Sequence, residues 1–157
     1  KLGYGYLFLG LTIPTTLILI GGVFRTALSA GQPVYLKKDQ VRAYRYFQDI
    51  EYQDQIVLGA YQTGNSLPAF APVRVLVGHG PESYQGKEYL SSISKFFNSE
   101  TEMNYRLGYL ADNKIDYIFW GPEERLIGEW DPNLSDYLVQ VYSWNNYQIF
   151  RFVEPSG

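Results

Sequence analysis

The sequence predicts an α/β protein, a small three-layer Rossmann-like sandwich of about five strands with a parallel core and a C-terminal antiparallel hairpin. Short apolar runs bounded by Gly and Pro indicate strands, and segments between them whose apolar residues return every three to four positions indicate helices. An Asn-Asn pair between two β-rich runs near the C-terminus indicates the hairpin. An apolar helix of the transmembrane type is expected before the sandwich.

That first helix is predicted for residues 1–25, because everything between Lys1 and Arg25 is uncharged and mostly apolar. At about 1.5 Å per residue, a helix of this length reaches across a hydrocarbon core of about 30 Å. A buried core segment or an interfacial helix is the alternative, favoured by Pro14 in the middle of the run. A cleaved signal peptide is disfavoured because the apolar run is too long. The absence of an initiator Met suggests a piece of a longer protein.

Residues 26–37 contain Gly31 and Pro33 and are expected to form a linker, so the α/β domain is predicted to occupy residues 38–157. A net charge of −3 without a long basic run argues against nucleic acid as a partner. The absence of Cys excludes disulfides, thiolate metal sites and cysteine nucleophiles. No cofactor is expected, because the sequence holds no phosphate loop and no metal-ligand spacing.

The first half of the domain is predicted to contain one helix and two strands. A helix capped by Asp39 should run to about Glu51, since its apolar residues return about every three positions. A buried strand is predicted for Ile56 to Tyr61 and another for Val73 to Val77. Pro68 and Pro72, between those strands, forbid a regular helix of any length.

The second half is predicted to contain two helices and three strands. The first helix has an apolar face formed by Tyr89, Leu90, Ile93, Phe96 and Phe97. The second starts at Ser99, where Ser99 and Glu102 have capping-box spacing. Because helices connect them, the strand at Val73 to Val77 and the next strand, Asp116 to Trp120, should be parallel. The hairpin strands are predicted at Leu138 to Tyr142 and Tyr147 to Val153.

Parallel strands place their carboxyl ends at one edge of a sheet, where α/β proteins build ligand crevices. If the first strand is parallel too, three polar, glycine-containing loops meet at that edge. They are Thr63-Gly64-Asn65, Gly78-His79-Gly80-Pro81-Glu82 and Gly121-Pro122-Glu123-Glu124. In the last two loops, Pro followed by an acid suits the first turn of a helix.

The chemistry of these loops does not define a reaction. His79, the sole histidine, more commonly bonds neighbouring backbone than it catalyses, and with Glu82 it gives a metal two ligands but no evident third. Glu123 and Glu124 are adjacent and do not normally face one site as an acid–base pair. Asn65 closes a turn as readily as it binds a sugar hydroxyl. No catalytic residue and no metal site is assigned.

The order of these motifs resembles a known family. An uncharged N-terminal span, a linker and a helix are followed by LGAYQTGNSLPAFAPVRVLVGHGPES and by KIDYIFWGPEER. This order is similar to the C-terminal extracytoplasmic domain of bacterial polytopic membrane glycosyltransferases of the dolichyl-phosphate-mannose protein mannosyltransferase-like class. The resemblance covers residues 35 to 125.

The resemblance implies an accessory domain of an enzyme that uses polyprenyl-phosphate-linked sugar, on the extracytoplasmic side of the cell membrane. The catalytic Asp of that family lies in an early loop to which no residue here corresponds, so the chain alone should be inert. Its partners would be the membrane, the remaining transmembrane part of the protein, and a sugar or lipid-linked acceptor. Because the three loops converge, we expect Thr63, Gly64, Asn65, His79, Glu82 and Glu123 to form an acceptor-binding or closing surface in such an enzyme.

Two other functions remain open. A membrane-anchored extracytoplasmic module would use the same loops to bind a ligand without catalysis. A free-standing enzyme using His79 would require residues 1–25 to be part of the core.

Overall fold

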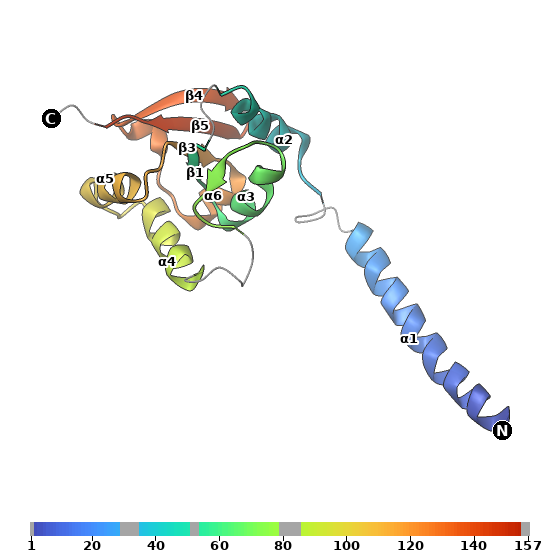
Figure 1. Cartoon of the computed structure of the whole chain (residues 1–157). Coiled ribbons are helices and arrows are strands. Elements are labelled where there is room, and N and C mark those ends of the chain that lie inside the picture. Colours follow the sequence, from blue (N-terminus) through green and yellow to red (C-terminus); the bar gives the residue numbers. More distant parts are fainter. Residues whose placement is uncertain (1, 29–34, 51–53, 79–85, 155–157) are drawn as a thin grey trace. The chain divides into compact units, whose positions relative to one another are not determined.

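A computed structural model describes residues 2–28, 35–50, 54–78 and 86–154 (Figure 1). The chain divides into two compact units, Lys1–Leu36 and Lys37–Gly157. The first unit contains the long helix α1 and the second contains a mixed α/β domain. Each unit is described by itself.

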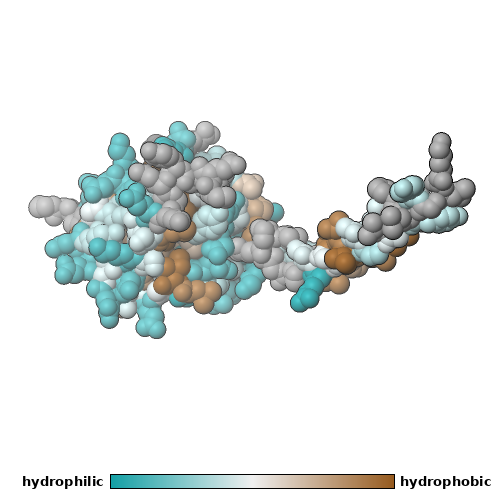
Figure 2. Space-filling view, turned by 90° about the horizontal axis from the view of Figure 1, so that it is seen from below, coloured by the Kyte–Doolittle hydropathy of each residue, from teal (hydrophilic) through white to brown (hydrophobic). Residues whose placement is uncertain are grey.

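Helix α1 spans Leu2–Leu28 and includes Pro14. Its described large apolar side chains are exposed, with Ile18 and Val23 at 74% and 70%, and Figure 2 shows apolar surface on part of the helix. The predicted helix is therefore present and extends a turn beyond residue 25.

The transmembrane assignment of residues 1–25 is not supported. Within the described residues, α1 included, no helix combines the length and apolarity that crossing a membrane requires.

The domain is built on a five-stranded sheet of order β2-β1-β3-β5-β4. Strand β1 pairs in parallel with both β2 and β3, and the hairpin β4–β5 adds to β3 in antiparallel orientation. The strands are β1 (Ile56–Leu58), β2 (Arg74–Val75), β3 (Tyr117–Trp120), β4 (Leu138–Trp144) and β5 (Tyr147–Phe152).

The strand number, the parallel core and the C-terminal hairpin agree with the prediction. The second and third strands are parallel, as predicted, but each pairs with β1 and not with the other. Strands β1 and β2 are only three and two residues long. A mixed α/β fold is therefore confirmed, whereas a Rossmann-like three-layer sandwich is not.

The helices of the domain are α2 (Lys38–Arg45), α3 (Tyr61–Ser66), α4 (Gly86–Phe97), α5 (Met103–Asp112) and α6 (Pro122–Ile127). Short 3-10 helices lie at η1 (Tyr46–Gln48), η2 (Leu67–Ala69) and η4 (Pro132–Leu134).

Helices pack on both faces of the central strand β3. Successive side chains of a strand point to opposite faces, so Phe119 and Trp120 belong to clusters on opposite faces of the sheet. The Phe119 ring lies 5.1 Å from that of Tyr44 in α2, and the Trp120 ring lies 5.6 Å from that of Phe97 in α4. The larger cluster contains Phe97, Trp120 and Phe150 and lies on the α4 side.

The segment after Lys37 differs from the predicted helix at both ends. The α-helix ends at Arg45 and continues as η1, and Asp39 lies inside the first turn instead of capping it. The Asp39 carboxylate accepts hydrogen bonds from Trp144 Nε1 at 3.1 Å and Asn145 Nδ2 at 3.0 Å. Its bonds to the hairpin lower the pKa of Asp39. Asp39 therefore links α2 to the β4–β5 turn.

Helix α4 is confirmed, whereas α5 begins later than predicted. Its N-cap residue is Glu102, without a side-chain hydrogen bond, so the capping box between Ser99 and Glu102 does not form. Arg106 instead ties the helices together: it donates to the carbonyl oxygens of Phe96 at 2.9 Å and Thr101 at 2.7 Å.

Candidate functional site

The carboxyl ends of β1 and β3 meet around the side chain of Glu124. One carboxylate oxygen accepts hydrogen bonds from the backbone N–H of Ala60 at 2.8 Å and the hydroxyl of Thr63 at 2.6 Å. The other accepts from the backbone N–H of Gly121 at 2.9 Å. Glu124 thereby joins the β1–α3 junction to the start of α6.

The position of Glu124 follows from the local sequence. Gly121 is the N-cap of α6 and Pro122 is its first residue, as the Gly-Pro-Glu pattern predicted. Glu124 is the third residue of the helix, from which a carboxylate reaches back to the N-cap N–H. A Cβ on Gly121 would lie 2.9 Å from the Tyr147 ring, so the close approach of the Gly121 backbone to Tyr147 requires glycine.

Glu124 has no exposed surface. Burial raises its pKa, and the hydrogen bonds from Thr63, Ala60 and Gly121 oppose that rise. With both oxygens engaged and out of reach of solvent, this carboxyl serves the structure and does not meet a substrate.

The β2 end joins the same edge through two glycines. A Cβ on Gly64 would lie 1.5 Å from the Val77 carbonyl oxygen, and one on Gly78 would lie 2.7 Å from the Gly64 carbonyl oxygen. The backbones of α3 and of the segment after β2 are therefore in direct contact. The predicted convergence of three loops holds for their described residues.

A second polar cluster connects this edge to α2. Gln40 Nε2 donates to the Tyr44 hydroxyl at 2.7 Å, and that hydroxyl lies 2.8 Å from Ser66 Oγ. Burial raises the pKa of Tyr44 to about 12, so the phenol stays protonated at neutral pH. The cluster fixes α3 against α2.

The predicted site residues have different surroundings. Thr63, Gly64 and Asn65 belong to the short helix α3 instead of a loop, and Gly64 lies against Val77. Thr63 and Gly64 are buried, and Asn65 is exposed. Glu123 is half-buried in the first turn of α6. His79 and Glu82 lie outside the described residues.

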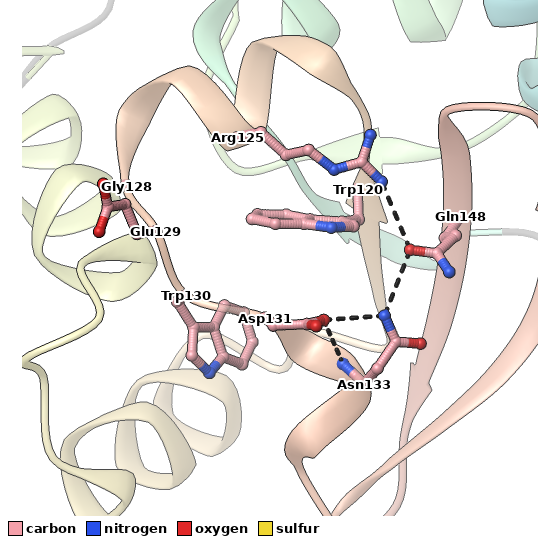
Figure 3. Close-up of a pocket in the computed structure, with 8 residues that line it drawn as sticks. All are labelled: Trp120, Arg125, Gly128, Glu129, Trp130, Asp131, Asn133 and Gln148. Atoms are coloured by element: carbon pink, nitrogen blue, oxygen red, sulfur yellow. Dashed lines mark hydrogen bonds between the residues drawn. The ribbon is translucent and has the colours of Figure 1, made fainter.

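A pocket of about 310 Å³ opens beside α6 (Figure 3). Sequence reasoning missed this pocket, because its residues come from β3, α6, the segment after α6 and β5. It is lined by Trp120, Arg125, Gly128, Glu129, Trp130, Asp131, Asn133 and Gln148.

The polar lining of the pocket is held by hydrogen bonds. Asp131 Oδ1 accepts from the backbone N–H of Asn133 at 2.9 Å and from its Nδ2 at 2.8 Å. Gln148 Oε1 accepts weaker bonds from Asn133 Nδ2 at 3.4 Å and Arg125 Nη2 at 3.5 Å. Arg125 also donates to the Asn146 carbonyl oxygen at 2.7 Å. The side chains are thus oriented before any ligand arrives.

The described part of the chain contains no group of three or more His, Cys, Asp or Glu side chains that is able to hold a metal ion. The two-ligand combination of His79 and Glu82 lies outside that part.

Comparisons with known proteins give a likeness in fold. No model of a protein family matches the chain, and no curated protein does. A solved structure described as the C-terminal globular domain of oligosaccharyltransferase from Archaeoglobus fulgidus is similar in fold, with a TM-score of 0.54 and 14% sequence identity. The similarity covers 74% of this chain and 98% of that chain.

This likeness shows a shared fold. The domain of this chain is similar in fold to the C-terminal globular domain of an archaeal oligosaccharyltransferase. A bacterial, mannosyltransferase-like class goes beyond this finding.

Proposed function

We propose that this chain is an accessory C-terminal domain of a membrane glycosyltransferase. The observation that carries the proposal is the fold likeness to the C-terminal globular domain of oligosaccharyltransferase, which extends over nearly all of that domain. The glycine-rich motif order along residues 35 to 125 supports the same class from the sequence side. The finer assignment, a polyprenyl-phosphate-sugar enzyme of the mannosyltransferase-like class, rests on that motif order.

In this proposal the domain contributes a surface and no chemistry. At the carboxyl edge, both oxygens of Glu124 are bonded to backbone or hydroxyl donors, and this carboxyl is fully buried. Asn65 and Glu123, by contrast, have accessible surface on neighbouring helices. These two side chains would contact a sugar or lipid-linked acceptor, or the transmembrane part of the enzyme.

In this proposal, apolar groups of the membrane or of the enzyme contact helix α1. The domain itself would lie on the extracytoplasmic side of the cell membrane. Side chains such as Ile18, Val23 and Phe24 are more than half exposed. Leaving so many contiguous apolar residues in water is unfavourable. The membrane, or the membrane-embedded part of the enzyme, would cover them.

The test is a transfer assay with two arms. In the first, the purified chain is incubated with a polyprenyl-phosphate-linked sugar and an acceptor, and no transfer is expected. In the second, Asn65→Ala and Glu123→Ala are introduced into the membrane enzyme that carries this domain, and transfer should fall. Asn104→Ala, an exposed asparagine of α5, is the matched control. Transfer by the chain alone, or unchanged transfer in both variants, would overturn the proposal.

A ligand-binding module without catalysis is the second candidate, favoured by the pocket beside α6. The two candidates differ in the second arm of the transfer assay, which uses the membrane enzyme. A binding module does not take part in transfer in any context, so that arm would show no transfer that depends on this domain.

A further inference from the structure

The pocket beside α6 has a composition suited to a small ligand with both apolar and polar surface. Trp120 and Gln148 are direct partners in the β3–β5 register, so both side chains emerge on the same face of the sheet. Trp130 reaches the pocket from the segment after α6, and its ring lies 6.1 Å from that of Trp120 at 73°. Two indoles and a strand glutamine therefore border one cavity.

The two indoles are rigidly held. Trp120 and Trp130 are only 4% and 8% exposed, and each packs against Phe97. They offer the cavity a small apolar surface that is held in place by packing. Binding a ligand to this surface therefore costs little free energy for ordering side chains of the protein.

The charge of the pocket favours a neutral ligand. Figure 3 shows the Arg125 guanidinium and the Asp131 carboxylate on opposite sides of the Trp120 ring, while the carboxylate of Glu129 points away from the other lining side chains. One cation and one anion thus face the cavity. An anion such as a phosphate would meet Asp131 without a second cation to compensate.

The hydrogen-bonding groups are those that pair with hydroxyls. Arg125 donates only, the Asp131 carboxylate accepts only, and the amides of Asn133 and Gln148 do both. A hydroxyl donates one hydrogen bond and accepts up to two, so it matches a rim that alternates donors and acceptors. The volume of about 310 Å³ is at the lower end of ligand pockets, which span about 300–1,000 Å³.

We propose that this pocket binds one ring of a neutral saccharide. The C–H groups of the ring contact the accessible parts of the Trp120 and Trp130 indoles, and its hydroxyls bond to Asp131, Asn133 and Gln148. The site is separate from the carboxyl-edge residues Thr63 and Asn65. The proposal stands on the pocket itself and holds whether or not the chain serves a glycosyltransferase.

The test uses the full chain in a zwitterionic detergent without a sugar headgroup. Methyl α-mannoside, methyl β-glucoside and N-acetylglucosamine are titrated separately, with glucose 6-phosphate as the anionic comparison. Binding is followed by saturation-transfer NMR from protein to sugar protons, and affinity by the change in tryptophan fluorescence. At least one neutral sugar should bind, more tightly than the phosphate.

The variants Asn133→Ala and Gln148→Ala should each weaken that binding about three- to tenfold, since each removes a neutral hydrogen-bonding group. Asn104→Ala is the matched control and should bind as the parent chain does. Circular dichroism establishes that each variant is folded. The proposal is overturned if no neutral sugar receives saturation, if glucose 6-phosphate binds best, or if both folded pocket variants bind with unchanged affinity.

This outcome is independent of the transfer assay. If the pocket variants lose sugar binding while transfer is unchanged in Asn65→Ala and Glu123→Ala, the pocket proposal alone is supported. If Asn65→Ala lowers transfer while the parent chain binds no sugar, the pocket proposal alone is overturned.

Discussion

Thr63 and Glu124 are separated by 61 positions in the sequence, yet the threonine hydroxyl donates to the glutamate carboxylate at 2.6 Å. The contact joins α3, which follows β1, to α6, which follows β3. Because β1 and β3 are parallel neighbours, their carboxyl ends are adjacent, and this hydrogen bond fixes the two helix starts to each other. The edge at which the parallel topology places the polar loops is thus organised by a buried acid.

Replacing Glu124 by Ala should reduce the free energy of unfolding by about 3 kcal/mol, because it leaves the donors of Ala60, Thr63 and Gly121 without their acceptor inside the protein. Urea denaturation followed by circular dichroism measures this loss. Glu123→Ala, at the half-buried neighbouring position, is the control and should change stability by less than about 0.5 kcal/mol. Equal effects at the two positions would contradict the role assigned to Glu124.

Glu124 should also give stability a specific pH dependence. Burial raises its pKa above the ordinary value of 4.5, so the folded state binds the proton more tightly than the unfolded state. Its contribution is fully present below the unfolded pKa and is lost as pH rises through the raised folded pKa. The free energy of unfolding of the parent chain, relative to Glu124→Gln, should therefore fall as pH increases from about 4 to about 7. A relative increase over that range would mean that the three hydrogen bonds outweigh burial.

Two glycines in helices should respond in opposite directions to alanine. Gly64→Ala places a Cβ 1.5 Å from the Val77 carbonyl oxygen, so the backbone must shift and stability should fall by more than about 3 kcal/mol. Gly108→Ala, in α5, meets no atom within 4 Å and should stabilise the chain by up to about 1 kcal/mol. Thermal unfolding of the two variants gives the comparison. Similar melting temperatures would show that α3 does not lie against Val77.

Arg106 should be intolerant of lysine. Its guanidinium donates to the carbonyl oxygens of Phe96, Asn98 and Thr101 around the end of α4, and it lies 4.6 Å from the Trp130 ring centroid. Lysine keeps the charge but has no planar fork, so Arg106→Lys should cost about 2 kcal/mol. Chemical denaturation measures the loss. Arg151→Lys, at an exposed position of strand β5, is the control, and a comparable loss there would argue against the capping role.

Much of the fold was predictable because its local signals agree with its tertiary structure. The apolar run before Gly121, the Gly-Pro start of α6 and the Asn145-Asn146 turn all specify their elements through nearby residues, and Asn145 indeed has a φ of 50°. The same reasoning failed at Ser99, where Arg106 ties the end of α4 and no capping box forms.

The candidate site was predictable only in location. Three strand ends were expected at one edge, and Gly64, Gly78 and Glu124 meet there. The part played by Glu124 was not predicted, since adjacent glutamates look alike in sequence while only one of them faces inward. The pocket beside α6 was missed altogether, because Trp120 and Gln148 become neighbours only through β3–β5 pairing.

The sequence by itself therefore determined the class of fold, the order of its main elements and the edge where its polar loops gather, because these depend on hydrophobic periodicity and on turn residues a few positions apart. Only the tertiary structure decided which side chains are buried, which carboxylate holds the edge together and which residues border a cavity. Those properties arise from contacts between residues far apart in the chain, such as Thr63 with Glu124, whose energies depend on burial and not on sequence spacing.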